Sequence, residues 1–189
     1  MKRIVLLITF VAALALCAGA QTFIDFSGMP MAKVPEQMQD LYPPGINLYW
    51  DNFSYVTPKA WDLEGPGFVV GPNAKDVVFT GGPLCNLAIP CSASIKLNGI
   101  MMIPGVQTFT PMSIMLTAGW TPNLVRVAAY NNGELVGRLT WKLTTEPRTF
   151  YFPAAWRVTQ LIFTPDFVGK TAVYPAGSMV IHNFTIMMH

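Results

Sequence analysis

Hydrophobic and polar residues alternate most regularly in the run ELVGRLTWKL at 134–143. Every second position from Leu135 onward is apolar or glycine, and most positions between them are polar. A period of two is what a β-strand with one buried and one solvated face requires. Two other apolar runs, 109–119 and 123–130, precede it, and the sequence Asn-Asn-Gly at 131–133 suits a tight hairpin turn. We therefore predict that the three runs form a three-stranded antiparallel meander, with Leu135 on its core-facing side.

Similar signals recur along the chain in shorter pieces, separated by Gly- and Pro-rich stretches. The aromatic-rich run 46–56 predicts either one strand or two short strands joined at Asp51-Asn52. About ten to twelve short strands with hardly any helical periodicity indicate a β-sandwich. The predicted fold is a single all-β domain, a jelly-roll-type antiparallel β-sandwich. Its other expected strands lie at 23–26, 76–80, 92–97, 148–152, 156–164 and 179–187.

The first twenty residues have the pattern of a signal peptide. Lys2-Arg3 is a short basic start, an apolar stretch follows, and Ala18-Gly19-Ala20 offers small residues at a cleavage site. We predict a signal peptide at 1–20 and a mature β-sandwich domain at 21–189, so the protein is expected to be secreted and extracellular. Cys17 leaves open a bacterial lipoprotein, although Leu16 occupies a position where such signals prefer Gly, Ala or Ser.

The charge of the mature chain argues against two classes of partner. The whole chain has 12 Lys and Arg against 10 Asp and Glu, and loss of Lys2 and Arg3 leaves 10 against 10. A neutral chain without a basic cluster has no electrostatic footprint for nucleic acid or anionic lipid. We expect neither nucleic-acid binding nor a stable membrane anchor.

Two cysteines, Cys85 and Cys91, bracket the short segment Asn-Leu-Ala-Ile-Pro. In an oxidising compartment we expect a disulfide between them, worth about 2 kcal/mol in the chain-entropy model. Two free thiols are the alternative. A zinc site is less favoured, because only His182 and His189 are available to complete it.

The order of several segments resembles that of a family of secreted jelly-roll domains. These segments are FIDF, GINLYWDNF, GFVVGPNAKDVVF, SIMLTAGW, VRVAAYNNGELV, WRVTQLIF and VIHNFTI. Such domains are similar to carbohydrate-binding modules and occur in bacterial exported proteins and secreted fungal proteins. The resemblance covers almost the whole mature chain and implies a jelly roll that binds sugars or surfaces.

The chain departs from that family in two places. Bacterial members often end in a sorting tail, whereas this chain ends at Met188-His189, so we expect it to be released. The family's closing strand often has an Asp that helps to hold calcium, and this chain has His182 there, beside Asn183. Imidazole is a poor calcium ligand. Asp25 and Asn183 remain as weak calcium candidates, and no other cofactor is expected.

The sequence carries no catalytic signature. The acidic residues are scattered without a recognisable glycosidase pair, and Glu64 and Glu134 are interpreted as loop and turn residues. There is no Gly-x-Ser-x-Gly motif and no Cys–His couple, and His182 is interpreted as a structural histidine. We therefore expect a protein that is not an enzyme, with a hydrolase of unrecognised carboxylates as a distant third hypothesis.

Aromatic rings beside polar groups are the candidate ligand contacts. A ring offers an apolar face to a sugar, while nearby amides and carboxylates bind its hydroxyls. The candidates are Trp50, Asp51, Asn52, Trp61 and Trp120. For the three tryptophans, burial in the core is the alternative; Trp141 and Trp156 are assigned to the core by their alternation.

Our leading hypothesis is a secreted, non-catalytic binding module for carbohydrate or another extracellular surface. The alternative is a secreted structural or interaction protein, such as an effector or matrix component, that binds a protein partner. The many methionines suit adaptable contacts if exposed, and suit core packing equally well. Asn52-Phe53-Ser54 is an N-glycosylation sequon, so Asn52 is expected to carry glycan in a eukaryotic host.

Overall fold

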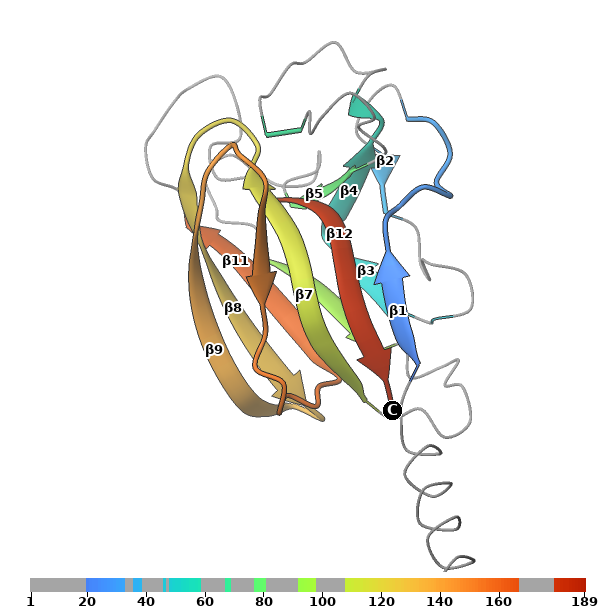
Figure 1. Ribbon diagram of the computed structural model, residues 1–189, viewed down its shortest axis with the longest axis vertical. Coiled ribbons are helices and arrows are strands. Elements are labelled where there is room, and N and C mark those ends of the chain that lie inside the picture. Colours follow the sequence, from blue (N-terminus) through green and yellow to red (C-terminus); the bar gives the residue numbers. More distant parts are fainter. Residues whose placement is uncertain are drawn as a thin grey trace, which may run out of the picture.

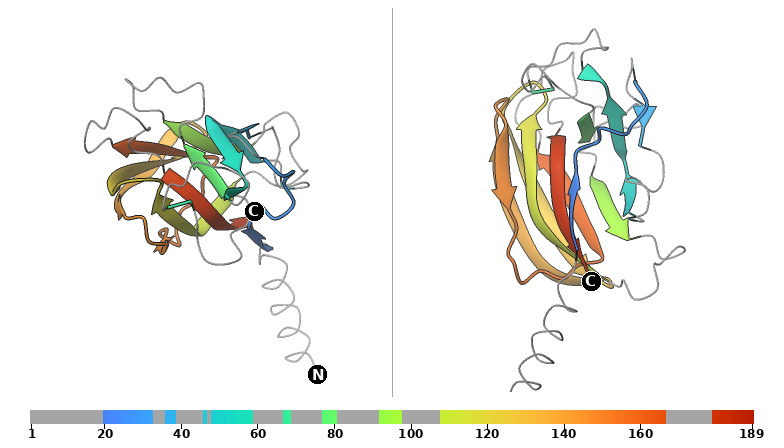
Figure 2. Two further views of the ribbon diagram at one scale, coloured as in Figure 1. Left: turned by 90° about the horizontal axis from the view of Figure 1, so that it is seen from above. Right: turned by 45° about the vertical axis from the view of Figure 1, so that its right-hand side comes forward.

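The computed structural model describes residues 20–32, 36–38, 46, 48–58, 67–68, 77–80, 92–97, 108–166 and 179–189. Within them, strands form two antiparallel sheets, called sheet A and sheet B, that pack face to face (Figures 1 and 2). Sheet A has seven strands in the order β10 (Arg148–Tyr151), β7 (Phe109–Ala118), β12 (Met179–Met188), β5 (Val77–Thr80), β4 (Phe53–Val56) and β2 (Glu36–Gln37), with β1 (Gln21–Ile24) also paired to β12. Sheet B has five strands in the order β3 (Leu48–Asp51), β6 (Ala93–Leu97), β11 (Gln160–Asp166), β8 (Asn123–Asn131) and β9 (Glu134–Leu143).

Strands β5 to β12 form one long two-stranded ribbon folded over itself. Along the ribbon β5 pairs with β12, β6 with β11, β7 with β10 and β8 with β9. Further pairing of β12 with β7 and of β11 with β8 completes the two sheets. This connectivity is that of a jelly roll. The predicted fold, a single-domain jelly-roll β-sandwich, is therefore confirmed.

The tip of the ribbon is the β8–β9 hairpin, and its turn has the backbone that the sequence predicts. Asn132 and Gly133 have φ angles of 49° and 86°, and a type I′ turn needs a positive φ at both central residues. A Cβ at Gly133 would meet no atom within 4 Å, so glycine serves there for its backbone freedom rather than for space. The Asn132 N–H donates to Thr159 Oγ1 at 2.9 Å and ties the tip to the segment before β11.

Strand β7 lies in a different sheet from β8, so the predicted three-stranded meander is wrong. β7 pairs with β10 and β12 in sheet A, whereas β8 pairs with β9 and β11 in sheet B. The turn at 119–122 therefore carries the chain from one sheet to the other. Alternation identifies the buried face of a strand but not its partner, and consecutive strands are neighbours only about two-thirds of the time.

The run 46–56 contains two strands, β3 and β4, which decides between the two predicted alternatives. They belong to opposite sheets, so Asn52 between them marks a crossing of the sandwich. Asn52 has a φ of 58°, a left-handed conformation that asparagine tolerates better than most residues. Its Nδ2 donates to the carbonyl of Ser92 at 3.1 Å, which fixes this corner to the start of β6.

A β-bulge near the hairpin tip reverses the predicted orientation of Leu135. The β8–β9 register shifts between Ala129, which pairs with Gly137, and Tyr130, which pairs with Leu135. Val136 is the extra residue on β9. Directly opposite residues face the same side of a sheet. Leu135 therefore faces outward beside Tyr130, and it is 47% exposed.

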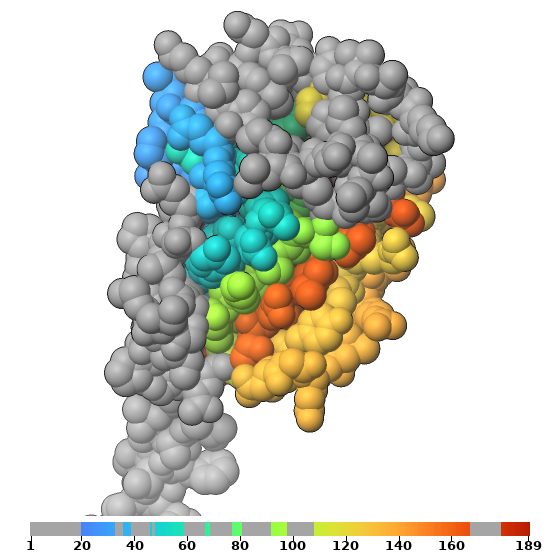
Figure 3. Space-filling view, turned by 180° about the vertical axis from the view of Figure 1, so that it is seen from behind, coloured from blue at the N-terminus to red at the C-terminus, as the bar shows by residue number. Residues whose placement is uncertain are grey.

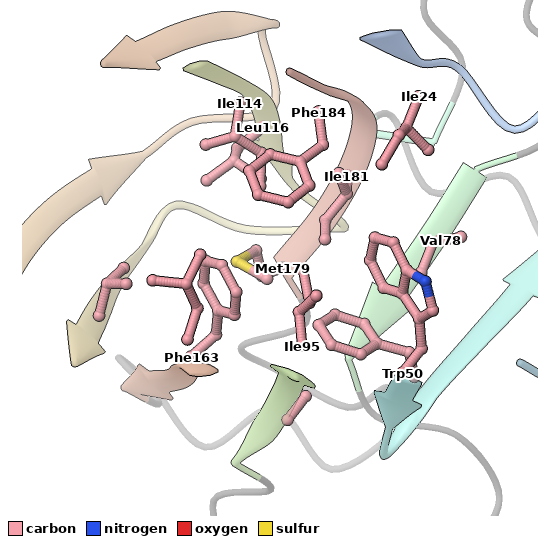
Figure 4. Packing of buried hydrophobic residues seen from close by; sticks show 14 of the residues in the cluster. Ile24, Trp50, Val78, Ile95, Ile114, Leu116, Phe163, Met179, Ile181 and Phe184 are labelled. Atoms are coloured by element: carbon pink, nitrogen blue, oxygen red, sulfur yellow. The ribbon is translucent and has the colours of Figure 1, made fainter. Parts of the chain in front are cut away.

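The inward faces of both sheets meet in one large hydrophobic core, where side chains from the two layers converge (Figure 4). Trp50 is 2% exposed and meets Phe26 and Phe53 edge-on, with ring centroids 5.6 and 5.4 Å apart. Phe53 of sheet A lies 6.2 Å from Phe163 of sheet B, so aromatic contacts link the layers. Such pairs add about 0.5–1.5 kcal/mol to the stabilisation from burial.

A second group of rings fills the sandwich next to β9. Trp141 stacks on Phe150 at 4.9 Å and meets Phe152 at 5.1 Å, and Phe152 lies 6.0 Å from Trp156. Trp141 is 8% and Trp156 7% exposed, which confirms their assignment to the core. Gly137 makes room for Trp156, because a Cβ there would lie 2.7 Å from Cζ2 of that ring.

We predict that Gly137→Ala lowers the free energy of unfolding by about 1–3 kcal/mol, because the added methyl group overlaps a packed ring. Urea unfolding followed by circular dichroism measures the change. In a Trp156→Leu background the ring is absent, so the same alanine substitution is expected to cost much less. An equal loss in both backgrounds contradicts this explanation.

Candidate functional site

The outward sides of β8 and β11 in sheet B are partly exposed, whereas β4 and β5 of sheet A are buried on both faces. On β8 and β11, inward positions are buried, and the outward ones are half-buried or exposed. Figure 3 shows this face, with β3 and β6 in cyan and green beside β11, β8 and β9 in orange and gold. Outward side chains of neighbouring strands lie close enough together to form one surface.

A depression of about 380 Å³ lies on this face, built around Ala128 of β8. Ala128 pairs with Arg138 of β9 on one side and with Ile162 of β11 on the other. Arg126 and Tyr130 lie two residues away along β8 and therefore face the same side. The alanine side chain ends at Cβ, whereas its four neighbours are long. This difference in length produces the hollow.

The two ends of the depression differ in chemistry. At one end is the half-buried Tyr130, and the outward Leu135 lies directly opposite it on β9. At the other end Arg126 is flanked by Thr140 of β9 and Thr164 of β11, its partners in the two ladders. Leu135 does not line the depression itself, so one end offers a ring, and the other a guanidinium group and two hydroxyls.

Charged groups around the depression are unevenly paired. Arg126 forms an ion pair with Asp166 at 3.6 Å, and the two side chains are 60% and 47% exposed. Such a surface pair contributes about 0–1 kcal/mol to stability, so it orients Arg126 more than it stabilises the fold. Arg138 has no ion-pair partner in the described part of the chain. Farther along the face, Lys96 Nζ lies 4.6 Å from the centre of the Tyr49 ring.

Three of the ligand contacts predicted from the sequence lie away from this depression. Trp50 is in the core, the alternative left open for its ring, and has no exposed face for a ligand. Asp51 faces outward on β3, at the opposite edge of sheet B from β9. Asn52 is exposed at the corner between the sheets, where its amide binds the Ser92 carbonyl. Glycosylation of Asn52 stays a prediction.

Trp120 lies on the other side of the sandwich. Its ring is 4.9 Å from Phe68 and packs on a small cluster over the outer face of sheet A. The buried members of this cluster are Val56, Phe68, Val77, Phe79 and Val180.

The structure does not describe Trp61, Cys85 or Cys91. The ligand role of Trp61 and the disulfide between the two cysteines therefore stay predictions.

The ligand contacts predicted from the sequence do not include Arg126, Tyr130 or Arg138. They occupy outward positions of the alternating runs, which usually belong to an ordinary solvated face. The useful signal was the run Arg126-Val127-Ala128-Ala129-Tyr130, in which a small outward residue lies between two large ones. Only the strand register brings Arg138 beside them.

The two calcium candidates are both engaged with other groups. Asp25 Oδ1 accepts hydrogen bonds from the Ser27 N–H at 3.1 Å and the Ser27 hydroxyl at 2.6 Å. Asn183 Nδ2 lies 3.7 Å from Met115 Sδ. Within the described ranges, no three residues among His, Cys, Asp and Glu gather as a metal site. Calcium takes about six to eight oxygen ligands, so a site here would need oxygens from elsewhere.

His182 occupies the outer side of β12, where it joins a small polar network. Thr117 Oγ1 donates to the Gly67 carbonyl at 2.5 Å and lies 2.8 Å from His182 Nε2. Because the hydroxyl proton goes to Gly67, Nε2 of the histidine acts as the donor to Thr117. Burial lowers the pKa of His182 to about 4, against a smaller opposite effect of the Gly67 backbone. This setting is that of a structural histidine.

Fold and site together define a jelly-roll β-sandwich with a depression over β8, β9 and β11 of one sheet. No protein-family model and no curated protein matches the sequence. A solved DUF4465 family protein from Bacteroides caccae ATCC 43185 is similar over 91% of this chain and 94% of its own, with a TM-score of 0.53 and 8% identity. At that identity the likeness shows the fold alone.

Two other solved structures overlap more loosely. The family 32 CBM from C. perfringens NanJ, in complex with galactose, is 17% identical over 88% of this chain and 99% of its own, with a TM-score of 0.40. The K1 cleaved adhesin domain of Lys-gingipain from Porphyromonas gingivalis W83 is 13% identical over 90% and 99%, with a TM-score of 0.39. Because both TM-scores are this low, these two structures support no conclusion about the present chain.

In the part of the chain that the structure describes, no helix has the length and hydrophobicity needed to cross a bilayer.

We predict that the protein loses stability as the pH falls below about 6.5, because the fold disfavours protonated His182. Its folded pKa of about 4 lies below the ordinary 6.5, so the unfolded chain binds the proton first. The stabilisation present above pH 6.5 is therefore lost progressively down to about pH 4. Between pH 7.5 and pH 5 the expected loss is about 2 kcal/mol, measured by urea unfolding.

His182→Gln removes the titrating ring and is expected to flatten this dependence. His189 is the matched control: burial and then the charge of Arg157 lower its pKa, but this C-terminal ring is much less enclosed. His189→Gln should therefore remove only a small part of the pH effect. An unchanged dependence in His182→Gln would show that another group is responsible.

Proposed function

We propose that this protein is a secreted, non-catalytic binding module that holds a carbohydrate on the outer face of sheet B. The depression around Ala128 carries this proposal, because it combines a ring with hydrogen-bond donors in one small hollow. Its volume of about 380 Å³ lies at the lower end of the roughly 300–1,000 Å³ that ligand pockets occupy. A ligand of one or two sugar units suits that size.

The two ends of the depression match the two kinds of surface on a sugar. The Tyr130 ring provides apolar contact for the C–H face of a pyranose. Arg126, Thr140 and Thr164 provide guanidinium and hydroxyl groups for the sugar hydroxyls. An open site of this kind binds with a free energy of roughly −4 to −8 kcal/mol, in the millimolar to micromolar range.

The chemistry of the lining favours binding over hydrolysis. A glycosidase generally needs two carboxyl groups on either side of the scissile bond. Among the described residues, the side chains that line the depression include no carboxylate. The nearby Asp166 forms an ion pair with Arg126 instead.

The extracellular location is part of the proposal and depends on the N-terminal signal pattern. In that compartment the Cys85–Cys91 disulfide is expected to form. Mass spectrometry of the protein from culture medium tests both points: cleavage after Ala20 gives a mature chain that begins at Gln21, and reduction adds about 2 Da for one disulfide.

We predict that Tyr130→Ala weakens binding to the recognised polysaccharide about ten-fold, because the sugar loses its stacking surface. A glycan array followed by pull-down on insoluble polysaccharides identifies the ligand, and titration calorimetry measures the affinity. Tyr151→Ala is the matched control: Tyr151 is 74% exposed on β10 of sheet A and should leave binding unchanged.

Ala128→Met provides a second test that leaves the aromatic ring in place. The longer side chain fills the hollow from its floor and is expected to weaken binding without unfolding the protein, because Ala128 faces solvent. Equal losses in the Tyr130 and Tyr151 variants would contradict the proposed site. Recovery of a protein partner, with no polysaccharide retained, would favour an interaction protein instead.

A further inference from the structure

Two arginine side chains line the depression from neighbouring strands, and both carry a permanent positive charge. Arg126 on β8 is opposite Thr140, and Arg138 on β9 is opposite Ala128. The arginines are therefore diagonal neighbours on the same sheet face, with Cα atoms roughly 7–8 Å apart. Side chains of this length are able to reach one small anion between them.

The positive charge on this face is only partly compensated. Asp166 neutralises Arg126 at 3.6 Å, whereas Arg138 has no ion-pair partner within the described ranges. Concentrated positive charge on an otherwise neutral mature chain attracts anions to this face. The charged residues at outward positions of sheet B are the basic Lys96, Arg126, Arg138 and Lys142 and the acidic Asp51 and Asp166.

We infer that the carbohydrate bound here carries an acidic group, a carboxylate or a sulfate, and that Arg138 binds it. The inference rests on the proposed function, because it names the chemistry of the ligand of that same face. A guanidinium fork presents paired N–H donors that match two oxygens of such a group. A sugar ring stacked on Tyr130 extends its substituents over Ala128, beside Arg138.

Asp166 has a defined role in this arrangement: it lowers the affinity for the anion. Its carboxylate neutralises Arg126 and repels a second negative group nearby. An acidic ligand therefore meets the Arg138 guanidinium, which has no ion-pair partner among the described residues, and the Arg126 guanidinium, which is already paired. Removing the charge of Asp166 frees Arg126 to join Arg138 on the same anion, so the loss of a protein side-chain charge strengthens binding.

The experiment measures the affinity of the full chain for three glycan probes by calorimetry. These are an oligogalacturonate, a sulfated dextran oligosaccharide and a neutral cello-oligosaccharide. Arg138→Gln is expected to weaken binding of the preferred acidic probe roughly ten-fold or more, and Asp166→Asn to strengthen it several-fold. The first two probes distinguish a carboxylate from a sulfate, and affinity for the acidic probe should fall as salt is raised.

Lys142→Gln is the charge-matched control, because Lys142 is outward on β9 but does not line the depression. It should change acidic binding little. Suppose that a neutral probe binds in a Tyr130-dependent manner and that Arg138→Gln leaves all affinities unchanged. That result excludes the acidic ligand but still supports the proposed binding face. If no glycan binds at all, both the proposed function and this inference are contradicted.

Discussion

The pairing of β12 on both of its edges is the constraint on which the sandwich depends. Along one edge β12 pairs with β7 over its whole length, and along the other it pairs with β1 and β5. The last strand of the chain thus binds the first strand and the start of the folded ribbon into one sheet. Each of these ladders joins segments distant in sequence, and such contacts form late and slowly in folding.

The two sheets differ in what lies over their outer faces. Sheet A carries the second cluster around Phe68 over its outer face, with Thr117 and His182 in a polar network beside it. Strands β4 and β5 are consequently buried on both sides. Among the described residues no such cluster covers β8 and β11 of sheet B, whose outward residues are half-buried or exposed, although the outward Ser94 on β6 is buried.

The features that could be predicted from the sequence are those that depend on interactions between residues close together in the chain. The β8–β9 hairpin was predicted because Asn132 and Gly133 supply the required positive φ angles, and Trp141 and Trp156 were assigned to the core by alternation. The partner of β7 could not be predicted, since it depends on a strand about 70 residues away. One bulge residue moved Leu135 to the opposite face, and no pattern in the run signals it.

The candidate site could not be predicted from the sequence, because the fold does not determine which residues occupy the outward positions of β8. Inward and outward residues alternate along β8, so Arg126, Ala128 and Tyr130 line the depression while Val125, Val127 and Ala129 pack in the core. Because β8 is paired on both edges, its backbone keeps the outward residues in register whatever their identity. Substitution at an outward position therefore changes the surface of the depression at little cost in stability. The same independence makes outward residues uninformative in a single sequence, because the fold places almost no demand on them.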